Sequence, residues 1–376
     1  MSQKKKKIRA AFRKNRAVRT REHDLTRQLQ DPEYPDDRLV RAERISGKGQ
    51  LSRRRTVVAS ADESAAGAPV QLDVDRDACL PGRVLRVGGL RSTVQAADGR
   101  LFQCATRRLL KTLSTDQRHV LAAGDRVLFR PAGVDEGIIQ RVEPRHGELC
   151  RTIRGRRQVL VANVDQLLIV SSAAEPMLKP NLIDRLLITA EKNGIRPLIC
   201  INKVDLVHPA DLQPLAGVYG QMGYEVLLLS ATAGVGVPRL RNHLRDRESV
   251  LLGQSGVGKS SLLNAIQPGL HLEVRSVSAE SQKGRHTTTS ARLIPLAMGG
   301  FVVDTPGIRQ FQLWDVIPEE ITGFCRDLRP FVSLCRFPDC THTHEADCAV
   351  KHAVADGRID ARRYESYCQL LAGEEP

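Results

Sequence analysis

The sequence predicts a multidomain protein with three folded parts: a small β-barrel, an α/β domain with a largely parallel sheet, and an α-helical C-terminal domain. Three observations predict this division. Short runs that alternate apolar and polar residues begin near residue 79, longer apolar runs alternate with helical patterns over 164–310, and cysteines cluster near the C-terminus. A length of 376 residues also suits two or three domains of about 150 residues each.

The composition is that of a folded protein, with 41% hydrophobic and 27% charged residues. Aromatic residues make up only 4%, so we expect aliphatic cores. No run reaches the roughly 18 apolar residues that a membrane span needs, and the basic N-terminus lacks the apolar stretch of a secretory signal. We therefore expect a cytoplasmic protein with no membrane partner.

Residues 1–75 are predicted to be a basic disordered tail and linker. The first 60 residues carry 18 Lys and Arg against 7 Asp and Glu, which is most of the net charge of +14. They contain few large apolar residues, so they cannot bury enough surface to offset the entropy of ordering. Such an arm binds nucleic-acid phosphates by releasing counterions, or it serves only as a solubilising tail.

Residues 76–147 are predicted to form a small closed barrel. Turn signals such as Asp98-Gly99 and Ala123-Gly124 separate short alternating runs. The runs are Arg83–Val87, Ser92–Ala96, Leu101–Ala105, Asp125–Arg130 and Ile138–Val142. This spacing favours an OB-fold, which often binds oligonucleotides, although an SH3-like barrel has a similar pattern. Arg107, Arg108 and Lys111 either contact RNA or form a solvated face.

Residues 148–312 are predicted to form an α/β domain, because buried-strand patterns alternate with helical ones. The expected strands are Gln166–Ser171, Pro197–Ile201, Glu225–Ser230, Ser249–Leu252 and Phe301–Val303. The expected helices are Asn181–Asn193, Val237–Arg245 and Lys259–Ile266.

A phosphate-binding loop stands between the strand that ends at Leu252 and the helix-like run that follows. The residues that match G-x-x-x-x-G-K-[ST] are Gly253, Gln254, Ser255, Gly256, Val257, Gly258, Lys259 and Ser260, and Ser261 follows them. Glycines let backbone N–H groups surround the phosphates, and the helix N-terminus adds a favourable dipole. Lys259 is expected to reach the β- and γ-phosphates, and the Ser260 hydroxyl to bind Mg²⁺.

A second motif indicates that the base is guanine. Asn202, Lys203, Val204 and Asp205 form N-K-V-D directly after an expected strand. A carboxylate at Asp205 accepts hydrogen bonds from N1–H and the 2-amino group of guanine, two donors that adenine lacks. Asn202 can bond the base and brace the phosphate loop, and the Lys203 stem can cover the ring. Ser230-Ala231 ends another expected strand and can direct a backbone N–H at the guanine oxygen.

A third motif indicates a sensor for the γ-phosphate. Asp304-Thr-Pro-Gly307 follows an expected strand, which suits a water-mediated Mg²⁺ contact and a Gly N–H on the γ-phosphate. Thr287, Thr288 and Thr289 lie in a polar stretch upstream, where one threonine can complete the Mg²⁺ shell when GTP is bound. Residues 275–290 are then a switch loop.

Ile308 occupies the position where many GTPases carry a water-orienting glutamine, and it cannot hydrogen-bond. We therefore expect slow hydrolysis by the isolated protein. His286 is the imidazole beside the switch threonines and is the candidate catalytic residue together with Lys259. The alternative is that His286 contacts only RNA or solvent.

The order of the motifs is permuted. Ordinary GTPases place the phosphate loop first and N-K-x-D last, whereas here Asn202 precedes Gly253 and Asp304 comes after both. The sequence therefore predicts a circularly permuted P-loop GTPase domain, whose second switch leads directly into the C-terminal segment.

Residues 313–376 are predicted to form a helical zinc-binding domain. Cys335, Cys340, His342 and Cys348 have the composition of a closed Cys₃His site for one structural Zn²⁺, with His344 and His352 as competing ligands. The flanking segments 318–328 and 358–371 have helical patterns. A unit of about 60 residues has a small core, so zinc would contribute folding free energy.

Together these motifs resemble the bacterial RsgA/YjeQ family of circularly permuted GTPases, over roughly residues 80–371. The resemblance implies an N-terminal OB-fold, a central GTPase domain and a C-terminal zinc-binding domain. It also implies a role in late maturation of the small ribosomal subunit, with GTP hydrolysis stimulated by that subunit. The expected partners are the small subunit and its rRNA, GTP and GDP, with Mg²⁺ bound beside GTP; we expect a monomer. Two other functions stay open: a GTP-regulated scaffold, and a GTPase that acts on tRNA or mRNA.

Overall fold

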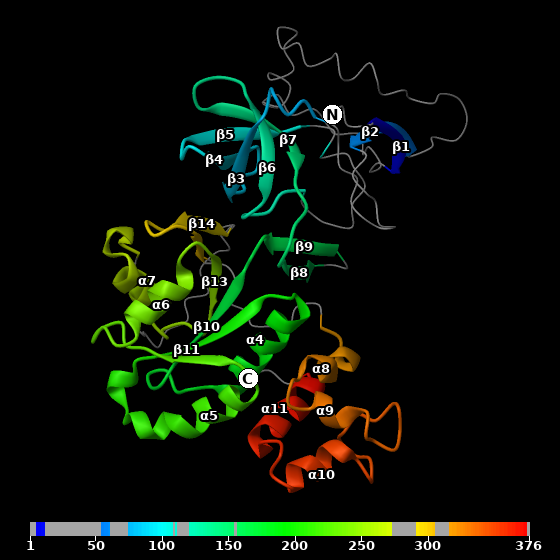
Figure 1. The fold of residues 1–376 in the computed structure, drawn as a ribbon, viewed down its shortest axis with the longest axis vertical. Coiled ribbons are helices and arrows are strands. Elements are labelled where there is room, and N and C mark those ends of the chain that lie inside the picture. The colour runs from blue at the N-terminus through cyan, green and yellow to red at the C-terminus, as the bar shows by residue number, and fades with distance from the viewer. Residues whose placement is uncertain are drawn as a thin grey trace. The chain divides into compact units, whose positions relative to one another are not determined.

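The computed structural model describes residues 5–11, 54–60, 74–107, 110, 120–153, 156–272, 291–304 and 316–373 (Figure 1). The chain forms two compact units, which are described separately. The first unit contains Met1–Arg145 and Ile153–Ala162, and the second contains His146–Thr152 and Asn163–Pro376.

The segment predicted to be a disordered tail contains two paired strands. Strand β1 (Lys5–Ala11) runs antiparallel to β2 (Arg54–Ser60), with Lys5 opposite Ser60 and Ala11 opposite Arg54. The prediction overlooked the β-branched run Thr56-Val57-Val58, whose residues favour extended backbone. This strand pairing was not part of the prediction for residues 1–75.

The first unit contains the predicted five-stranded barrel. Its strands are β3 (Leu80–Arg86), β4 (Arg91–Ala96), β5 (Leu101–Thr106), β6 (Arg126–Pro131) and β7 (Glu136–Val142). They hydrogen-bond in the order β3-β4-β5-β7-β6, and an antiparallel pairing of β3 with β6 closes the barrel. Closure in this order agrees with the OB-fold prediction.

The barrel core follows from the alternation of the strands. Val84, Val94, Phe102 and Ile139 are buried inside it. Phe129 packs against Phe102 with ring centroids 4.9 Å apart.

Close packing inside the barrel excludes larger residues at two strand positions. A Cβ on Gly82 would lie 2.8 Å from the Phe129 ring, and one on Gly137 would lie 2.9 Å from it. Strands β8 (Leu149–Ile153) and β9 (Arg156–Val161) follow, where the chain passes between the units.

The second unit is built on a mostly parallel sheet. Strands β10 (Gln166–Ser172), β11 (Arg196–Asn202), β12 (Glu225–Leu228), β13 (Glu248–Leu252) and β15 (Phe301–Asp304) are parallel, and β14 (Arg292–Pro295) runs antiparallel to β15. Their order is β12-β11-β10-β13-β15-β14. The five predicted strands are confirmed, and β14 was not predicted.

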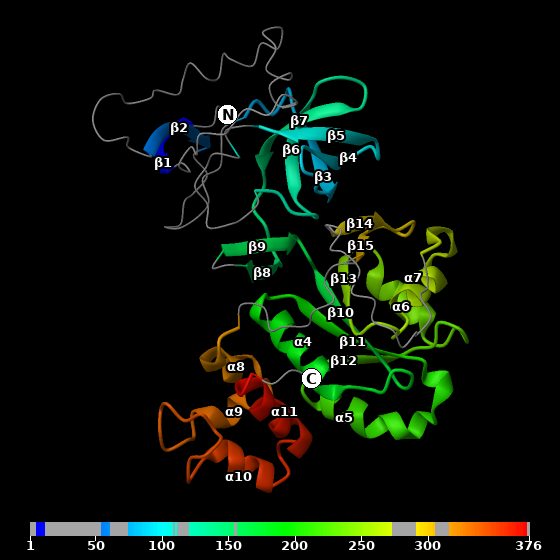
Figure 2. The ribbon, with the colours of Figure 1, turned by 180° about the vertical axis from the view of Figure 1, so that it is seen from behind.

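Four helices accompany this sheet (Figures 1 and 2): α4 (Pro180–Lys192), α5 (Gln213–Gln221), α6 (Val237–Leu244) and α7 (Lys259–Ile266). Short 3₁₀ turns occur at η1 (Val204–Leu206), η2 (Pro209–Leu212) and η3 (Pro268–Leu270). Apolar side chains of α6 and α7 share one core with β10, β11 and β13, whereas α4 contacts β10 and β11. The α/β prediction is confirmed.

The C-terminal part of the second unit is helical: α8 (Pro318–Phe324), α9 (Arg329–Val332), α10 (Ala349–Ala355) and α11 (Ala361–Leu371). Its core includes Ile321, Leu328, Tyr367 and Leu370, and also Ile188 from α4. Helix α4 therefore contributes to both the sheet layer and the C-terminal core. Among the described helices, none is long and apolar enough to cross a membrane.

Candidate functional site

The phosphate-loop motif lies between the end of β13 and the start of α7, as the sequence predicted. A Cβ on Gly253 would lie 1.9 Å from the Val170 carbonyl oxygen, so any side chain there would displace the loop. Gly258 has φ of 91°, and a Cβ on it would lie 2.3 Å from Asn202 Nδ2. Glycine is therefore required at both positions by close contacts with β10 and β11 residues.

Lys259 folds over the loop that precedes it. Its Nζ donates to the carbonyl oxygens of Gly253 (2.8 Å) and Gln254 (2.7 Å). Ser260 and Ser261 follow in the first turn of α7, where backbone N–H groups lack helical acceptors. The ammonium group and these N–H groups together make a favourable environment for phosphate.

Asn202 connects the predicted base-binding motif to the phosphate loop. It ends β11 and is 1% exposed. Its Nδ2 donates to the Val257 carbonyl oxygen (2.8 Å), and its Oδ1 accepts from the Ala231 N–H (3.2 Å). The predicted brace between Asn202 and the phosphate loop is present. The Ala231 N–H, expected to reach the guanine oxygen, donates here to Asn202.

Asp205 lies in η1 with its side chain exposed. Thr232 Oγ1 donates to its Oδ2 (3.3 Å), and hydrogen bonds from the Ser230 and Thr232 hydroxyls hold the pKa of Asp205 below its usual value. Lys203 has φ of 61°, and its Nζ donates to the Glu175 carbonyl oxygen. Asp205 is thus an ionised acceptor at the surface beside Asn202.

The parallel strands β11, β13 and β15 end in Asn202, Leu252 and Asp304. Because carboxyl ends of parallel strands meet at one edge, the three motifs converge where α/β sheets bind ligands. The side chain of Asp304 is outside the described residues. His286, Thr287, Thr288, Thr289 and Gly307 are also outside them, so their roles stay predictions.

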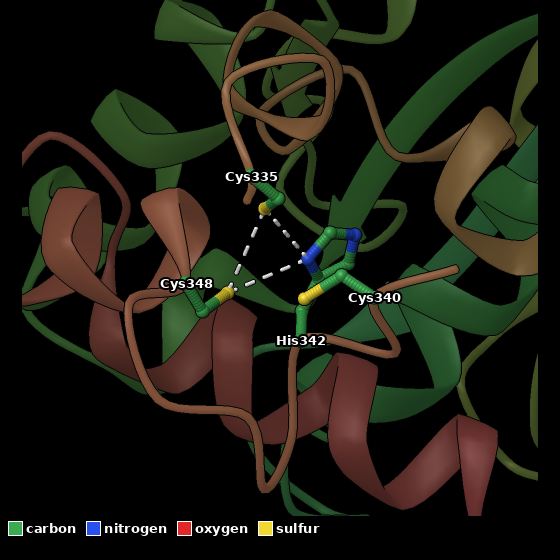
Figure 3. A group of neighbouring side chains, drawn as sticks. All are labelled: Cys335, Cys340, His342 and Cys348. Carbon is green, nitrogen blue, oxygen red and sulfur yellow. Dashed lines mark hydrogen bonds between the residues drawn. The ribbon is translucent and has the colours of Figure 1, made fainter. Parts of the chain in front are cut away.

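The predicted metal ligands converge in a loop between α9 and α10 (Figure 3). One ligand atom from each of Cys335, Cys340, His342 and Cys348 lies within 4.8 Å of all the others. His342 Nδ1 is 3.4 Å from the sulfurs of Cys335 and Cys348, which are 3.9 Å apart.

This donor set fits zinc. A tetrahedron with Zn–S bonds of about 2.3 Å has sulfurs about 3.8 Å apart, close to the spacing found here. Burial lowers the pKa of His342, which favours the neutral imidazole that a metal needs. His344 lies apart from the cluster with its side chain 81% exposed, and His352 is exposed on α10. The structure therefore places His342, and not His344 or His352, beside the three cysteines.

Residues that no motif identified hold the cysteine loop in place. Tyr364 and Tyr367 of α11 donate their hydroxyls to the carbonyl oxygens of His342 (2.7 Å) and Thr341 (2.8 Å). The Glu345 carboxylate accepts from the backbone of Thr341 (2.7 Å) and Thr343 (3.0 Å). Burial opposes ionisation of Glu345, but these hydrogen bonds outweigh it and lower the pKa to about 2. Polar side chains that the sequence does not mark as functional therefore hold the loop that carries the predicted metal ligands.

A buried ionic cluster joins α4 to the C-terminal helices. Arg363 of α11 donates to Asp184 of α4 (2.6 Å) and to Asp327 (3.0 Å), and Tyr219 of α5 donates to Asp184 (2.7 Å). Asp184 is fully buried and Arg363 is 4% exposed. Sequence reasoning missed this cluster because its members are far apart in the chain.

Comparison with known proteins agrees with this geometry. The family model described as RsgA GTPase matches residues 142–314. A small ribosomal subunit biogenesis GTPase RsgA from Sodalis glossinidius is 40% identical over 296 residues, covering 77% of this chain and 84% of that protein. The RsgA protein of Chlorobaculum parvum is 40% identical over 304 residues, covering 78% and 97%.

Two solved structures have the same fold. The crystal structure of YjeQ from Thermotoga maritima superposes with a TM-score of 0.65 at 34% identity, covering 78% of this chain and 98% of that one. YloQ, described as a circularly permuted GTPase, gives a TM-score of 0.62 at 31% identity, covering 80% and 96%. With relatives this similar over most of its length, and with N-K-V-D placed before the phosphate loop on one sheet, the chain belongs to the RsgA family of circularly permuted GTPases.

Proposed function

We propose that this GTPase acts in late maturation of the small ribosomal subunit, that the subunit stimulates its hydrolysis of GTP, and that its binding to rRNA depends on the nucleotide state. The observation that carries the nucleotide part is the contact of Asn202 with both Val257 and Ala231, which joins the three nucleotide loops. The ribosomal part is supported by the relatives, whose names describe small ribosomal subunit biogenesis. Such a factor works in the cytoplasm, where ribosomal subunits are.

In this proposal the phosphate loop binds the nucleotide phosphates and Asp205 binds the guanine edge. Lys259 stabilises the negative charge that develops on the β- and γ-phosphates. The Ser260 hydroxyl, one of Thr287–Thr289 and Asp304 would hold Mg²⁺, which would supply further charge neutralisation. Ile308 cannot orient the attacking water, so in this proposal His286 does so when the subunit is bound.

The same proposal assigns zinc a structural role. Cys335, Cys340, His342 and Cys348 would fill all four positions of a tetrahedral ion, leaving none for substrate. What zinc supplies is a cross-link that fixes the loop between α9 and α10.

GTP turnover of the full-length protein with and without purified small subunits tests this function. We expect slow turnover alone and a rate increase of at least tenfold with small subunits. Large subunits, naked rRNA and tRNA serve as controls. Equal stimulation by naked RNA or tRNA would favour a GTPase that acts on those molecules. Subunit binding that is independent of nucleotide and leaves turnover unchanged would indicate a scaffold instead.

A further inference from the structure

Thr232 belongs to no predicted motif, yet it lies beside the carboxylate assigned to the base. Its Oγ1 donates to Asp205 Oδ2 (3.3 Å) and lies 3.0 Å from Ser230 Oγ. We propose that Thr232 is a positioning residue for guanine specificity, which fixes the rotation of the Asp205 carboxylate so that its remaining acceptor sites meet the base. This inference rests on the proposed function, because it presumes that Asp205 binds guanine.

The backbones that carry Thr232 and Asp205 are both held in place. Asp205 lies in η1, where the Val204 N–H donates to the Leu229 carbonyl oxygen (3.1 Å). The Thr232 loop is closed by the Ser230 N–H, which donates to the Val235 carbonyl oxygen (3.0 Å). Because both backbones are fixed, the contact between hydroxyl and carboxylate sets the orientation of the Asp205 side chain, not the position of its main chain.

A count of donors and acceptors explains why this orientation matters. An ionised carboxylate only accepts hydrogen bonds and offers about four lone-pair sites. The Thr232 hydroxyl occupies one of these sites, on Oδ2, and this contact also favours the ionised form of Asp205. About three sites then remain, which is enough for the two donors, N1–H and the 2-amino group, that guanine presents.

Thr232 is better suited than Ser230 for testing this inference. Ser230 is fully buried, and its Oγ also accepts from the Ala233 N–H (3.0 Å), so its loss would disturb the loop itself. Thr232 is exposed, and its hydroxyl can be removed without emptying a core. Its 3.3 Å contact is long compared with the usual O–H···O range of about 2.5–3.0 Å, so we expect a modest effect.

The experiment measures equilibrium binding of GTP, ITP and ATP to full-length parent, Thr232→Val and Thr232→Ser proteins. Thr232→Val should weaken GTP binding roughly fivefold, the size expected for loss of one ordinary hydrogen bond; we expect less than for a short bond to a charged group because this contact is long. ITP lacks the 2-amino group, so its affinity should fall less, and the preference for GTP over ITP should narrow. Thr232→Ser keeps the hydroxyl and should restore both values.

Two controls separate positioning from loss of structure. Thr93→Val removes a hydroxyl that accepts a hydrogen bond of the same 3.3 Å length in the barrel, and it should leave GTP affinity unchanged. In an Asp205→Ala background, which should itself cost on the order of a hundredfold in GTP affinity, Thr232→Val should cause no further loss.

The outcomes are distinct. A parent protein that binds ATP as well as GTP, or that keeps its GTP affinity after Asp205→Ala, would overturn the proposed guanine site. If the parent prefers GTP but Thr232→Val binds it within twofold of the parent, Thr232 does not position Asp205. A fivefold loss that recurs in the Asp205→Ala background would assign Thr232 to the loop rather than to Asp205, and would also overturn the inference.

Discussion

Asn202 holds together three loops of the nucleotide site with a single buried amide. The amide nitrogen of Asn202 donates to the Val257 carbonyl oxygen, and the amide oxygen accepts from the Ala231 N–H. Both polar atoms of the side chain therefore form hydrogen bonds within the protein. Gly258 allows this close approach because a Cβ there would lie 2.3 Å from the amide nitrogen. Because Asn202 links the three loops, each loop that contacts a nucleotide is held in place by contacts with the other two.

The contact of Asn202 with the phosphate loop was predicted from the N-K-x-D and phosphate-loop motifs. Its contact with the Ala231 N–H was not, because that N–H was assigned to the guanine oxygen. Thr232 and Glu345 were not predictable in the same way. Their residue types are common in solvated loops, and only the fold brings the Thr232 hydroxyl to Asp205 or the Glu345 carboxylate to two backbone N–H groups.

His286 is the residue-scale prediction for catalysis. His286→Ala should retain GTP affinity and subunit binding, because the imidazole is assigned to the attacking water rather than to the nucleotide. Turnover stimulated by small subunits should fall by roughly 10²–10⁴-fold, the usual contribution of a positioned acid or base. Single-turnover hydrolysis with saturating subunits measures this. Stimulated turnover equal to that of the parent would leave water positioning to backbone groups or to the ribosome.

At the scale of elements, α4 packs against two hydrophobic cores. One part of its surface contacts β10 and β11, while Ile188 lies in the core formed by α8, α10 and α11. Polar contacts accompany Ile188: Asp184 pairs with Arg363, Glu191 pairs with Arg326 (2.7 Å), and Lys192 pairs with Glu320. The C-terminal helices are therefore attached to the nucleotide domain through a helix of that domain.

Removing Arg363 should destabilise the second unit strongly. Arg363→Met would leave Asp184 and Asp327 without their buried cation, and breaking such a pair costs about 3–5 kcal/mol of unfolding free energy. Urea denaturation of the full chain measures the loss.

Arg358→Met is the matched control for Arg363, because its side chain is 67% exposed and 3.7 Å from Asp356. Its effect should stay within about 0.5 kcal/mol. If Arg363→Met proved as mild as Arg358→Met, the buried cluster would not hold α4 to α11.

Zinc removal should act on the same elements. The protein should carry about one Zn²⁺ per chain, and Cys340→Ala should lose it, because a structural site needs all four ligands. Melting of the helical segment should then occur at lower temperature, while GTP binding at low temperature is retained.

Cys368→Ala is the control for the metal site, since Cys368 lies on α11 outside the cluster, and it should keep the metal. Elemental analysis and thermal denaturation check both variants. Metal-free parent protein, purified without chelators, would contradict the assignment.

The elements themselves differed in how well the sequence predicted them. Alternating runs identified all five barrel strands. In β4, β5 and β6 buried residues alternate with less buried ones, whereas β3 and β7 each bury consecutive residues. Helix α5 was missed, since Gly217 and Gly220 weaken its helical pattern. Strand β14 was missed because its short run ends in Pro295, and proline argues against a strand. The shared helix α4 was predicted as an element, but its second packing face was not, since contacts with α8 and α11 depend on tertiary structure.

At the scale of the whole molecule, the permuted order changes what the nucleotide site connects to. The last strand of the sheet, β15, ends at Asp304, and the chain continues from there to α8 of the helical segment. An ordinary GTPase would continue into further strands of the same sheet. Here the predicted sensor for the γ-phosphate leads along the chain into the helical segment that carries the Cys₃His cluster. The pair of Asp184 in α4 with Arg363 in α11 attaches the same segment to the nucleotide domain.

The basic N-terminal segment is the part of the molecule that sequence analysis left most open, and its charge gives the last prediction. Residues 1–60 carry 18 Lys and Arg, and each phosphate neutralised by such a residue steepens the salt dependence of binding by about 0.9 in log–log slope. Deleting these residues should therefore weaken binding to small subunits and reduce the slope by several units.

The deletion also removes β1 and β2, so a second variant separates charge from structure. Replacing Arg13, Lys14, Arg16 and Arg19 by Gln changes four charges outside both strands. If all four contact phosphate, the slope should fall by roughly three to four units, while GTP turnover without subunits stays at the parent value. The measurement is subunit affinity between low and physiological salt. A slope that is the same for the parent, the deletion and the Gln variant would mean that the segment does not contact rRNA phosphates, and that its charge serves solubility alone.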